Sequence, residues 1–119
     1  MTDTIQRTIT QELINRYGAL NGDNDTLHYD AAYARAQGFA GTIAHGLMLL
    51  GPVAELAASR FGASWFAGGH VSMKWVAPTY AGDAITATID EAGKIEVYAA
   101  PERVVAVGVA DSHSGQAGA

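Results

Sequence analysis

The hydrophobic positions follow a helical period in the first half of the chain and a strand-like period in the second half. Apolar residues between Leu13 and Leu20 recur on one helix face and predict a short helix over residues 11–20. Thr10 is its expected N-cap, because a hydroxyl can accept a hydrogen bond from a free backbone N–H of the first turn. An Ala-rich segment that opens with an acidic residue predicts a second short helix over residues 30–37.

The longest helical segment covers residues 45–61 and is apolar on nearly all sides. Such a helix is normally buried on most of its faces, so it is the expected centre of the core. Pro52 lies inside this segment and lacks an amide proton, which predicts a kink. Gly62 is the expected end of the helix.

Beyond residue 69 apolar and polar residues alternate, which is typical of half-buried strands. The alternation predicts strands over residues 71–75, 85–89, 95–98 and 103–109, and weaker alternation adds one over residues 5–9. Helices followed by strands with short turns indicate an α+β fold, with an antiparallel sheet wrapped around the long helix. The exposed edges of such a sheet commonly pair with a second copy, so we expect a homodimer. The small, polar tail from about residue 112 is expected to be frayed.

Length and composition narrow the class of protein. The 119 residues fit one domain, 1–119, in which no linker or repeat is visible, and 49% hydrophobic residues suffice for a core. The formal net charge of −5 argues against a nucleic-acid partner, which would require a basic surface. Without cysteine there is no disulfide and no thiolate zinc site. No leader-like or membrane-spanning segment is apparent, so we expect a cytoplasmic protein with no membrane partner.

A loop over residues 21–28 carries the candidate chemistry. It is rich in Asn, Gly and Asp, which favour turns, and it holds Asp23 and His28 close together in the sequence. An Asp and a His in one short loop can present a proton acceptor and a proton donor to the same bound molecule. Downstream, His45 and Gly46 open the long apolar segment, where a helix start leaves N–H groups free to polarise an oxygen. Together these groups suit chemistry next to a carbonyl.

These residues resemble the MaoC-like, or hydratase 2, family of hot-dog-fold enzymes. The family signature is roughly Gly-Asp-x-Asn-Pro-Leu-His, then an Asp, an Ala-rich segment and a His-Gly that opens the central helix. The matching residues, in order, are Gly22-Asp23, Leu27-His28, Asp30 and His45-Gly46, with Pro78 and Gly82-Asp83 resembling a later connection between strands. The resemblance covers about residues 10 to 110 and includes the step of 17 residues from His28 to His45.

The resemblance implies a single hot-dog domain and the reversible hydration of a trans-2-enoyl thioester to an (R)-3-hydroxyacyl thioester. Asp23 and His28 would be the catalytic pair, and the Gly46 N–H would hold the thioester carbonyl oxygen. The expected partner is an acyl thioester of coenzyme A or of a carrier protein. No cofactor and no metal are expected.

Further contacts with the substrate are expected from five residues, Asn21, Asp25, His45, Trp65 and Trp75. His45 also has a structural interpretation, as a residue that positions the loop or caps the helix. Trp65 and Trp75 are interpreted as core or as lining of the acyl pocket. The acidic run that begins at Asp23 hints at a calcium loop, but its sixth and twelfth positions are His28 and Ala34 rather than Gly and Glu, so we reject calcium.

Three departures from the family pattern leave alternatives open. Asp25-Thr26 replaces Asn-Pro, Ala54 replaces a Ser found in several hydratases, and the stretch from Gly82 to Asp111 is shorter than usual. A second carboxylate at Asp25 is expected to raise the pKa of Asp23. One alternative function is a hot-dog thioesterase that uses a lone carboxylate such as Glu55. The other is a non-catalytic or specificity subunit of a heteromeric dehydratase.

Overall fold

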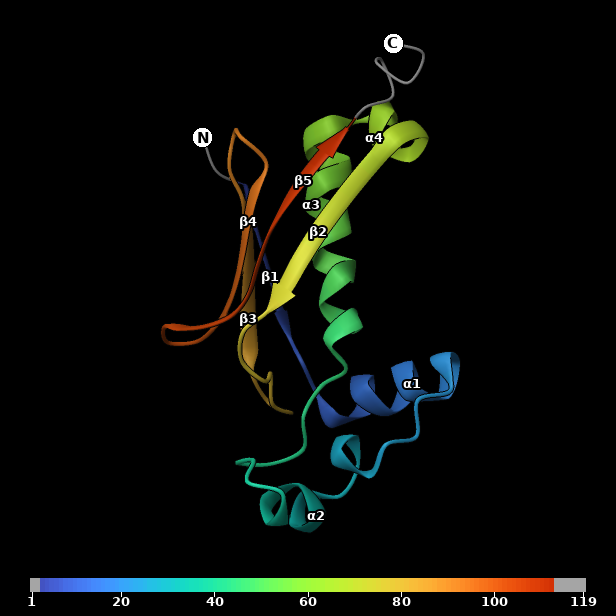
Figure 1. Ribbon diagram of the computed structural model, residues 1–119, viewed down its shortest axis with the longest axis vertical. Coiled ribbons are helices and arrows are strands. Elements are labelled where there is room, and N and C mark those ends of the chain that lie inside the picture. The colour runs from blue at the N-terminus through green and yellow to red at the C-terminus, as the bar shows by residue number, and fades with distance from the viewer. Residues whose placement is uncertain (1–2, 113–119) are drawn as a thin grey trace.

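The computed structural model of the protein describes residues 3–112. Its strands are β1 (Asp3–Thr8), β2 (Gly69–Trp75), β3 (Ala84–Ile89), β4 (Lys94–Ala99) and β5 (Arg103–Ser112). Its α-helices are α1 (Gln11–Asn21), α2 (Ala31–Ala36), α3 (Leu50–Phe61) and α4 (Ala63–Gly68), and the short 3₁₀ helices η1 (Thr26–His28) and η2 (Gly46–Leu49) precede α2 and α3. All strand pairs are antiparallel, in the order β1-β3-β4-β5-β2 (Figure 1).

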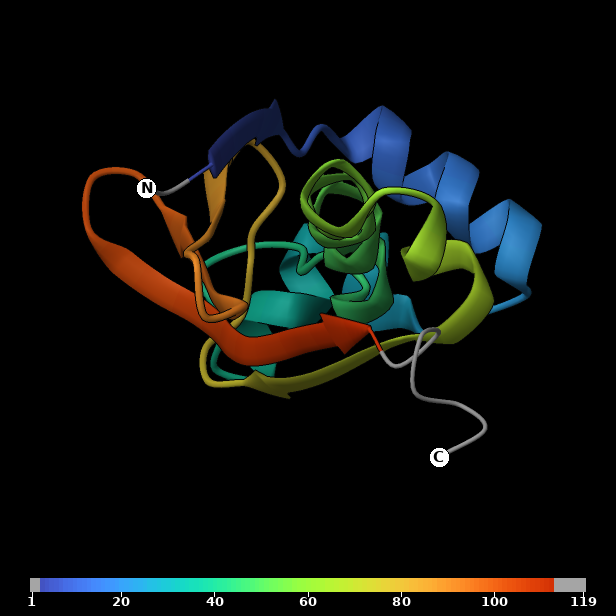
Figure 2. The same ribbon diagram turned by 90° about the horizontal axis from the view of Figure 1, so that it is seen from above.

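The sheet curves around α3, which appears end-on between the strands and α1 when the molecule is seen from above (Figure 2). One stripe of α3, formed by Val53, Leu56 and Ala57, is buried against the inward-facing side chains of the sheet. The fully buried positions alternate along β3 and β4, as in Ile85 to Ile89, which explains why the strand pattern was visible in the sequence. The fold is therefore α+β, a single hot dog, as predicted.

The two predicted short helices form, and Thr10 caps the first of them as expected. The Thr10 hydroxyl accepts from the Leu13 N–H at 3.1 Å, and the Asp30 carboxylate accepts from the Tyr33 N–H at 3.0 Å. Gly22 ends α1 with φ of 78°, a backbone conformation that favours glycine. Both helices lie near the end of α3 that is adjacent to η2, so the loop between them is held at that end of the core (Figure 1).

The prediction of one kinked helix over residues 45–61 is wrong in two respects. The α-helix begins only at Leu50, after the 3₁₀ turn of η2. Pro52 therefore lies in the first turn of α3, where N–H groups have no intrahelical partner, and its missing donor breaks no helical hydrogen bond. Gly62 follows α3 as predicted.

Two further differences lie near the end of the chain. The sequence did not predict α4, whose six residues are too few to show a helical period, and whose Trp65 stacks on Phe61 at 6.1 Å between ring centroids. Ser112 was assigned to a frayed tail, but it is the last residue of β5, and its hydroxyl donates to the Ser64 carbonyl at 2.9 Å. The rest of that predicted tail lies outside the described residues. Within residues 3–112, no helix is both long and apolar enough to cross a bilayer.

Candidate active site

The loop between α1 and η1 is built by three side chains at alternate positions, each of which accepts a hydrogen bond from the backbone amide two residues further on. Asn21 Oδ1 accepts from the Asp23 N–H at 2.9 Å, and Asp23 Oδ1 accepts from the Asp25 N–H at 3.1 Å. Asp25 Oδ1 then accepts from the Leu27 N–H at 3.1 Å and caps η1. Asn21 and Asp25, predicted to contact substrate, thus use these oxygens to shape the loop, and the second oxygen of Asp23 stays available for chemistry.

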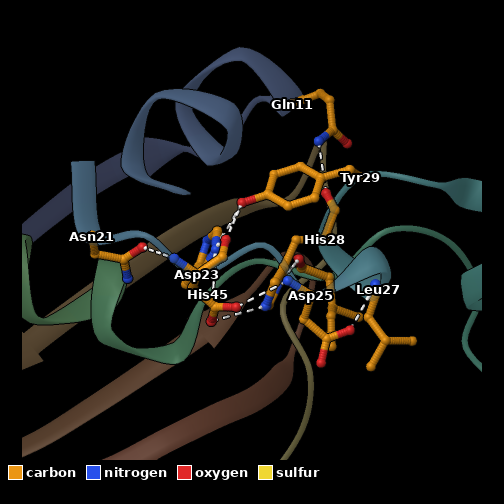
Figure 3. A network of polar contacts seen from close by, with 9 residues as sticks. Gln11, Asn21, Asp23, Asp25, Leu27, His28, Tyr29 and His45 are labelled. Atoms are coloured by element: carbon orange, nitrogen blue, oxygen red, sulfur yellow. Dashed lines mark hydrogen bonds and ion pairs between the residues drawn. The ribbon is translucent and has the colours of Figure 1, made fainter. Parts of the chain in front are cut away.

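That second oxygen faces two histidines (Figure 3). Asp23 Oδ2 lies 3.4 Å from Nε2 of His28 and 4.0 Å from Nε2 of His45. The two imidazoles stack, with ring centroids 3.8 Å apart and planes inclined by 21°. Both histidines are buried, whereas the Asp23 side chain is 44% exposed. The carboxylate therefore lies at the solvent side of the cluster and the imidazoles lie beneath it.

The hydrogen bond of His28 determines which of its ring nitrogens can accept a proton. Nδ1 lies 2.8 Å from the Ile43 carbonyl oxygen, and because a carbonyl can only accept, Nδ1 carries the proton. In the neutral ring Nε2 is then an acceptor, and it faces a carboxylate oxygen that is also an acceptor. A molecule that donates two protons, such as water, can bridge such a pair from the open side of the cluster.

The Asp23 carboxylate is held in its ionised form. The Asp25 N–H bonded to it lowers its pKa below the ordinary value of 3.8; desolvation opposes this, and attraction to His28 and His45 lowers the pKa further. The expectation that Asp25 raises the pKa of Asp23 is therefore wrong, because the backbone amide of Asp25 is the largest influence on that pKa and lowers it. Asp23 can serve as a permanent negative charge and hydrogen-bond acceptor.

His45 is the buried support of the cluster. Burial lowers its pKa below 6.5, the neighbouring His28 lowers it further, and interactions with Asp23 oppose this only in part, so the ring is neutral near pH 7. The ring also contacts the Tyr17 ring, with centroids 5.1 Å apart. This arrangement supports the structural interpretation of His45 as a residue that backs the ring of His28.

Two residues that bind this cluster together were not singled out from the sequence. The Gln11 side chain donates to the His28 carbonyl at 2.8 Å and accepts from the Thr42 hydroxyl at 2.6 Å, so it joins α1, η1 and the segment before η2. Tyr29 donates its hydroxyl proton to the Asp23 carbonyl. The Gln11 contacts join distant parts of the chain, so residue spacing gave no signal for them. Tyr29 lies in the same segment as Asp23 and directly after His28, and that position was the one available hint.

Gly46 and Trp75 lie together at a cavity next to His45. Gly46 is the first residue of η2, so its N–H has no partner within that helix. A Cβ at Gly46 would lie 3.3 Å from the Trp75 ring, which shows how closely the indole approaches this backbone. The cavity has a volume of about 390 Å³, and its lining is mostly apolar, including Phe39, Leu49 and Val105.

The structure thus separates the predicted site residues into groups. Asp23, His28 and His45 form one cluster, and Gly46 and Trp75 adjoin it through the cavity that His45 also lines. Trp65 does not line that cavity; it packs against the core at the far end of α3.

Glu55, the carboxylate considered for a thioesterase, does not join the cluster. Its Oε2 accepts from Nη2 of Arg7 at 2.8 Å in an exposed ion pair between α3 and β1.

The cluster also has the residue types of a metal site. One donor atom each of Asp23, His28 and His45 lies within 4.8 Å of the others. The lone pair of an imidazole nitrogen lies in the plane of its ring, so two stacked rings direct their lone pairs side by side rather than toward one ion. The residues therefore fit a bound ion poorly, and a site without metal remains our prediction.

The chain is similar to a known protein family and to solved structures. The model of the MaoC like domain family matches residues 2–113. The chain is 27% identical over 92 residues to an (R)-specific enoyl-CoA hydratase of Rhodospirillum rubrum; the match covers 77% of this chain and spans 64% of the length of that relative. The solved (R)-hydratase from A. caviae aligns with a TM-score of 0.76 at 18% identity, covering 92% of each chain. The ChsH1-ChsH2 complex from Mycobacterium tuberculosis aligns with a TM-score of 0.73 at 18% identity, covering 94% of each chain.

Proposed function

The chain belongs to the MaoC like domain family, and we propose that it catalyses the reversible hydration of trans-2-enoyl thioesters to (R)-3-hydroxyacyl thioesters. The observation that carries this proposal is the pair of acceptors, Asp23 Oδ2 and His28 Nε2, that face each other at 3.4 Å. The name of the Rhodospirillum rubrum relative supports the substrate class and the stereochemistry.

In this mechanism, a water molecule donates its two protons toward Asp23 Oδ2 and His28 Nε2, and its oxygen lone pair attacks C3 of the enoyl group. The proton that leaves the water passes to His28 Nε2, and the Asp23 carboxylate stabilises the resulting imidazolium. The same proton then goes to C2, so that water is added across the double bond. A positioned acid or base of this kind contributes about 10² to 10⁴ in rate.

The negative charge that builds on the thioester oxygen requires a donor. The Gly46 N–H is the proposed donor, because it has no partner within η2 and opens onto the cavity beside His45. Loss of one preorganised donor to such an oxyanion typically costs about 3–4 kcal/mol. The apolar cavity, with Trp75 on one wall, would take the acyl chain.

The proposed assembly is a homodimer. β2 is at one edge of the sheet, and on this strand Val71 and Trp75 remain 37% and 42% exposed although their alternation places them on the inward-facing side. A second copy pairing along this edge would cover them. A chain that is stable only with a different subunit would instead support the heteromeric alternative.

The test follows the loss of enoyl absorbance with crotonyl-CoA, in native protein and in Asp23→Asn. The Asn carbonyl can still accept from the Asp25 N–H, so this change removes the charge and leaves the loop intact. We expect kcat to fall about 10² to 10⁴-fold, and His28→Ala to lose a similar factor. Asp90→Asn is the matched control, since Asp90 also bonds backbone amides two and four residues on, in the turn before β4. Release of free thiol without loss of the enoyl group would instead indicate a thioesterase.

A further inference from the structure

The side chain of Tyr29 turns back from η1 toward the start of the loop (Figure 3). Its hydroxyl lies 2.5 Å from the backbone carbonyl oxygen of Asp23 and 3.4 Å from Nε2 of His45. We propose that Tyr29 is a positioning residue, whose hydroxyl fixes the Asp23 carboxylate relative to the two stacked imidazoles. The catalytic consequence of this contact rests on the hydratase function proposed above.

The direction of the hydrogen bonds shows how one hydroxyl acts on both partners. A carbonyl oxygen can only accept, so the hydroxyl proton of Tyr29 is committed to Asp23. The hydroxyl oxygen keeps its lone pairs and can accept only if His45 carries its proton on Nε2. The Nδ1 of His45 is then unprotonated, which agrees with its burial without a hydrogen-bond partner in the part of the chain that the structure describes. Tyr29 thus favours, together with Asp23, the Nε2-protonated tautomer of the ring on which His28 stacks.

The backbone next to Tyr29 supplies independent evidence for this role. Gly18 is buried in α1, where glycine is a poor helix former and no positive φ requires it. A Cβ at this position would lie 1.8 Å from the Tyr29 hydroxyl oxygen and 3.2 Å from the Asp23 carbonyl oxygen. The absence of a side chain at Gly18 is therefore what leaves room for the contact between Tyr29 and Asp23.

Two variants disturb this contact in different ways. Tyr29→Phe removes the oxygen and keeps the ring, whereas Gly18→Ala keeps the hydroxyl and occupies its space. We expect each to lower kcat for crotonyl-CoA hydration about 10- to 100-fold with KM nearly unchanged, because a misplaced catalytic group loses rate more than binding. The double variant is expected to be no worse than the poorer single variant, since both changes remove the same contact. Tyr98→Phe, on the outward-facing side of β4, is the matched control.

A second measurement does not depend on activity. Nitrogen NMR of labelled histidine reports which ring nitrogen is protonated, and we expect the Nε2-protonated form of His45 in native protein and a mixture of tautomers in Tyr29→Phe. Tyr98→Phe should match native protein. Unchanged kcat and unchanged His45 signals in Tyr29→Phe would overturn the positioning role. If native protein hydrates no enoyl thioester, yet Tyr29→Phe still alters the His45 signals, the positioning role stands and the hydratase function falls.

Discussion

Burial of a neutral His45 makes stability depend on pH in a direction that can be worked out. The ring is 3% exposed, and its pKa in the folded protein is lowered below the ordinary value of 6.5. Below that value the unfolded chain binds a proton that the folded protein does not, so the free energy of unfolding decreases as the pH falls. Above it both states are neutral at this position, and the full stability is present.

The change in the free energy of unfolding is limited because His45 binds only one proton. A single group changes the free energy of unfolding by at most about 1.4 kcal/mol per pH unit, so lowering the pH from 7.5 to 5.5 removes at most about 1.4 kcal/mol through His45. The assay is urea unfolding at both pH values for native protein and for His45→Gln, whose amide keeps a donor toward Tyr29 but does not titrate. The difference between the two pH values should be smaller in the variant, by at most about 1.4 kcal/mol. Equal differences in the two proteins would refute a buried, neutral His45.

Two further changes test the cavity and the supports of the loop. Gly46→Val adds atoms where even a Cβ would lie 3.3 Å from the Trp75 ring. We expect kcat/KM for crotonyl-CoA to fall at least about 10-fold while the circular dichroism spectrum is unchanged. A kcat/KM equal to that of native protein would contradict the role of this cavity. Gln11→Leu leaves the His28 carbonyl without its side-chain donor. Thermal unfolding should show a loss of about 1–3 kcal/mol in stability, and kcat for crotonyl-CoA should also be lower. A loss of stability alone would mean that Gln11 does not position His28.

The elements that were predictable are those whose evidence is local. Strands such as β3 and β4 bury every second side chain, so apolar and polar residues alternate in their sequences. The cap at Thr10 depends on an amide three residues away, and it could be predicted for the same reason. The start of α3 could not be predicted, because a segment that is apolar on all sides has no hydrophobic period to mark where a 3₁₀ turn becomes an α-helix.

The same distinction separates the parts of the candidate site. Asp23 and His28 lie in one loop, so their proximity could be inferred from the sequence. The stacking of His28 on His45 and the hydrogen bond from Gln11 to His28 join residues 17 positions apart, and only the packing of α1 against η1 and η2 creates them. In the sequence, Gly18 is only a poor helix former inside a predicted helix. Its role, to leave room for the Tyr29 hydroxyl, can be recognised only from the packing of the Tyr29 side chain against α1.

The replacement of Asn-Pro by Asp25-Thr26 now has a physical interpretation. A proline would restrict the backbone before η1, whereas here the Asp25 side chain caps η1 through the Leu27 N–H and its own N–H bonds to Asp23. The loop is therefore ordered by side-chain hydrogen bonds in place of a rigid ring, and one of them, from the Asp25 N–H to Asp23, lowers the pKa of Asp23. The amide that lowers this pKa belongs to the backbone, so an Asn at position 25 would supply it equally. The replacement by Asp25 therefore leaves the Asp23 carboxylate ionised, which is the state that the proposed addition of water requires.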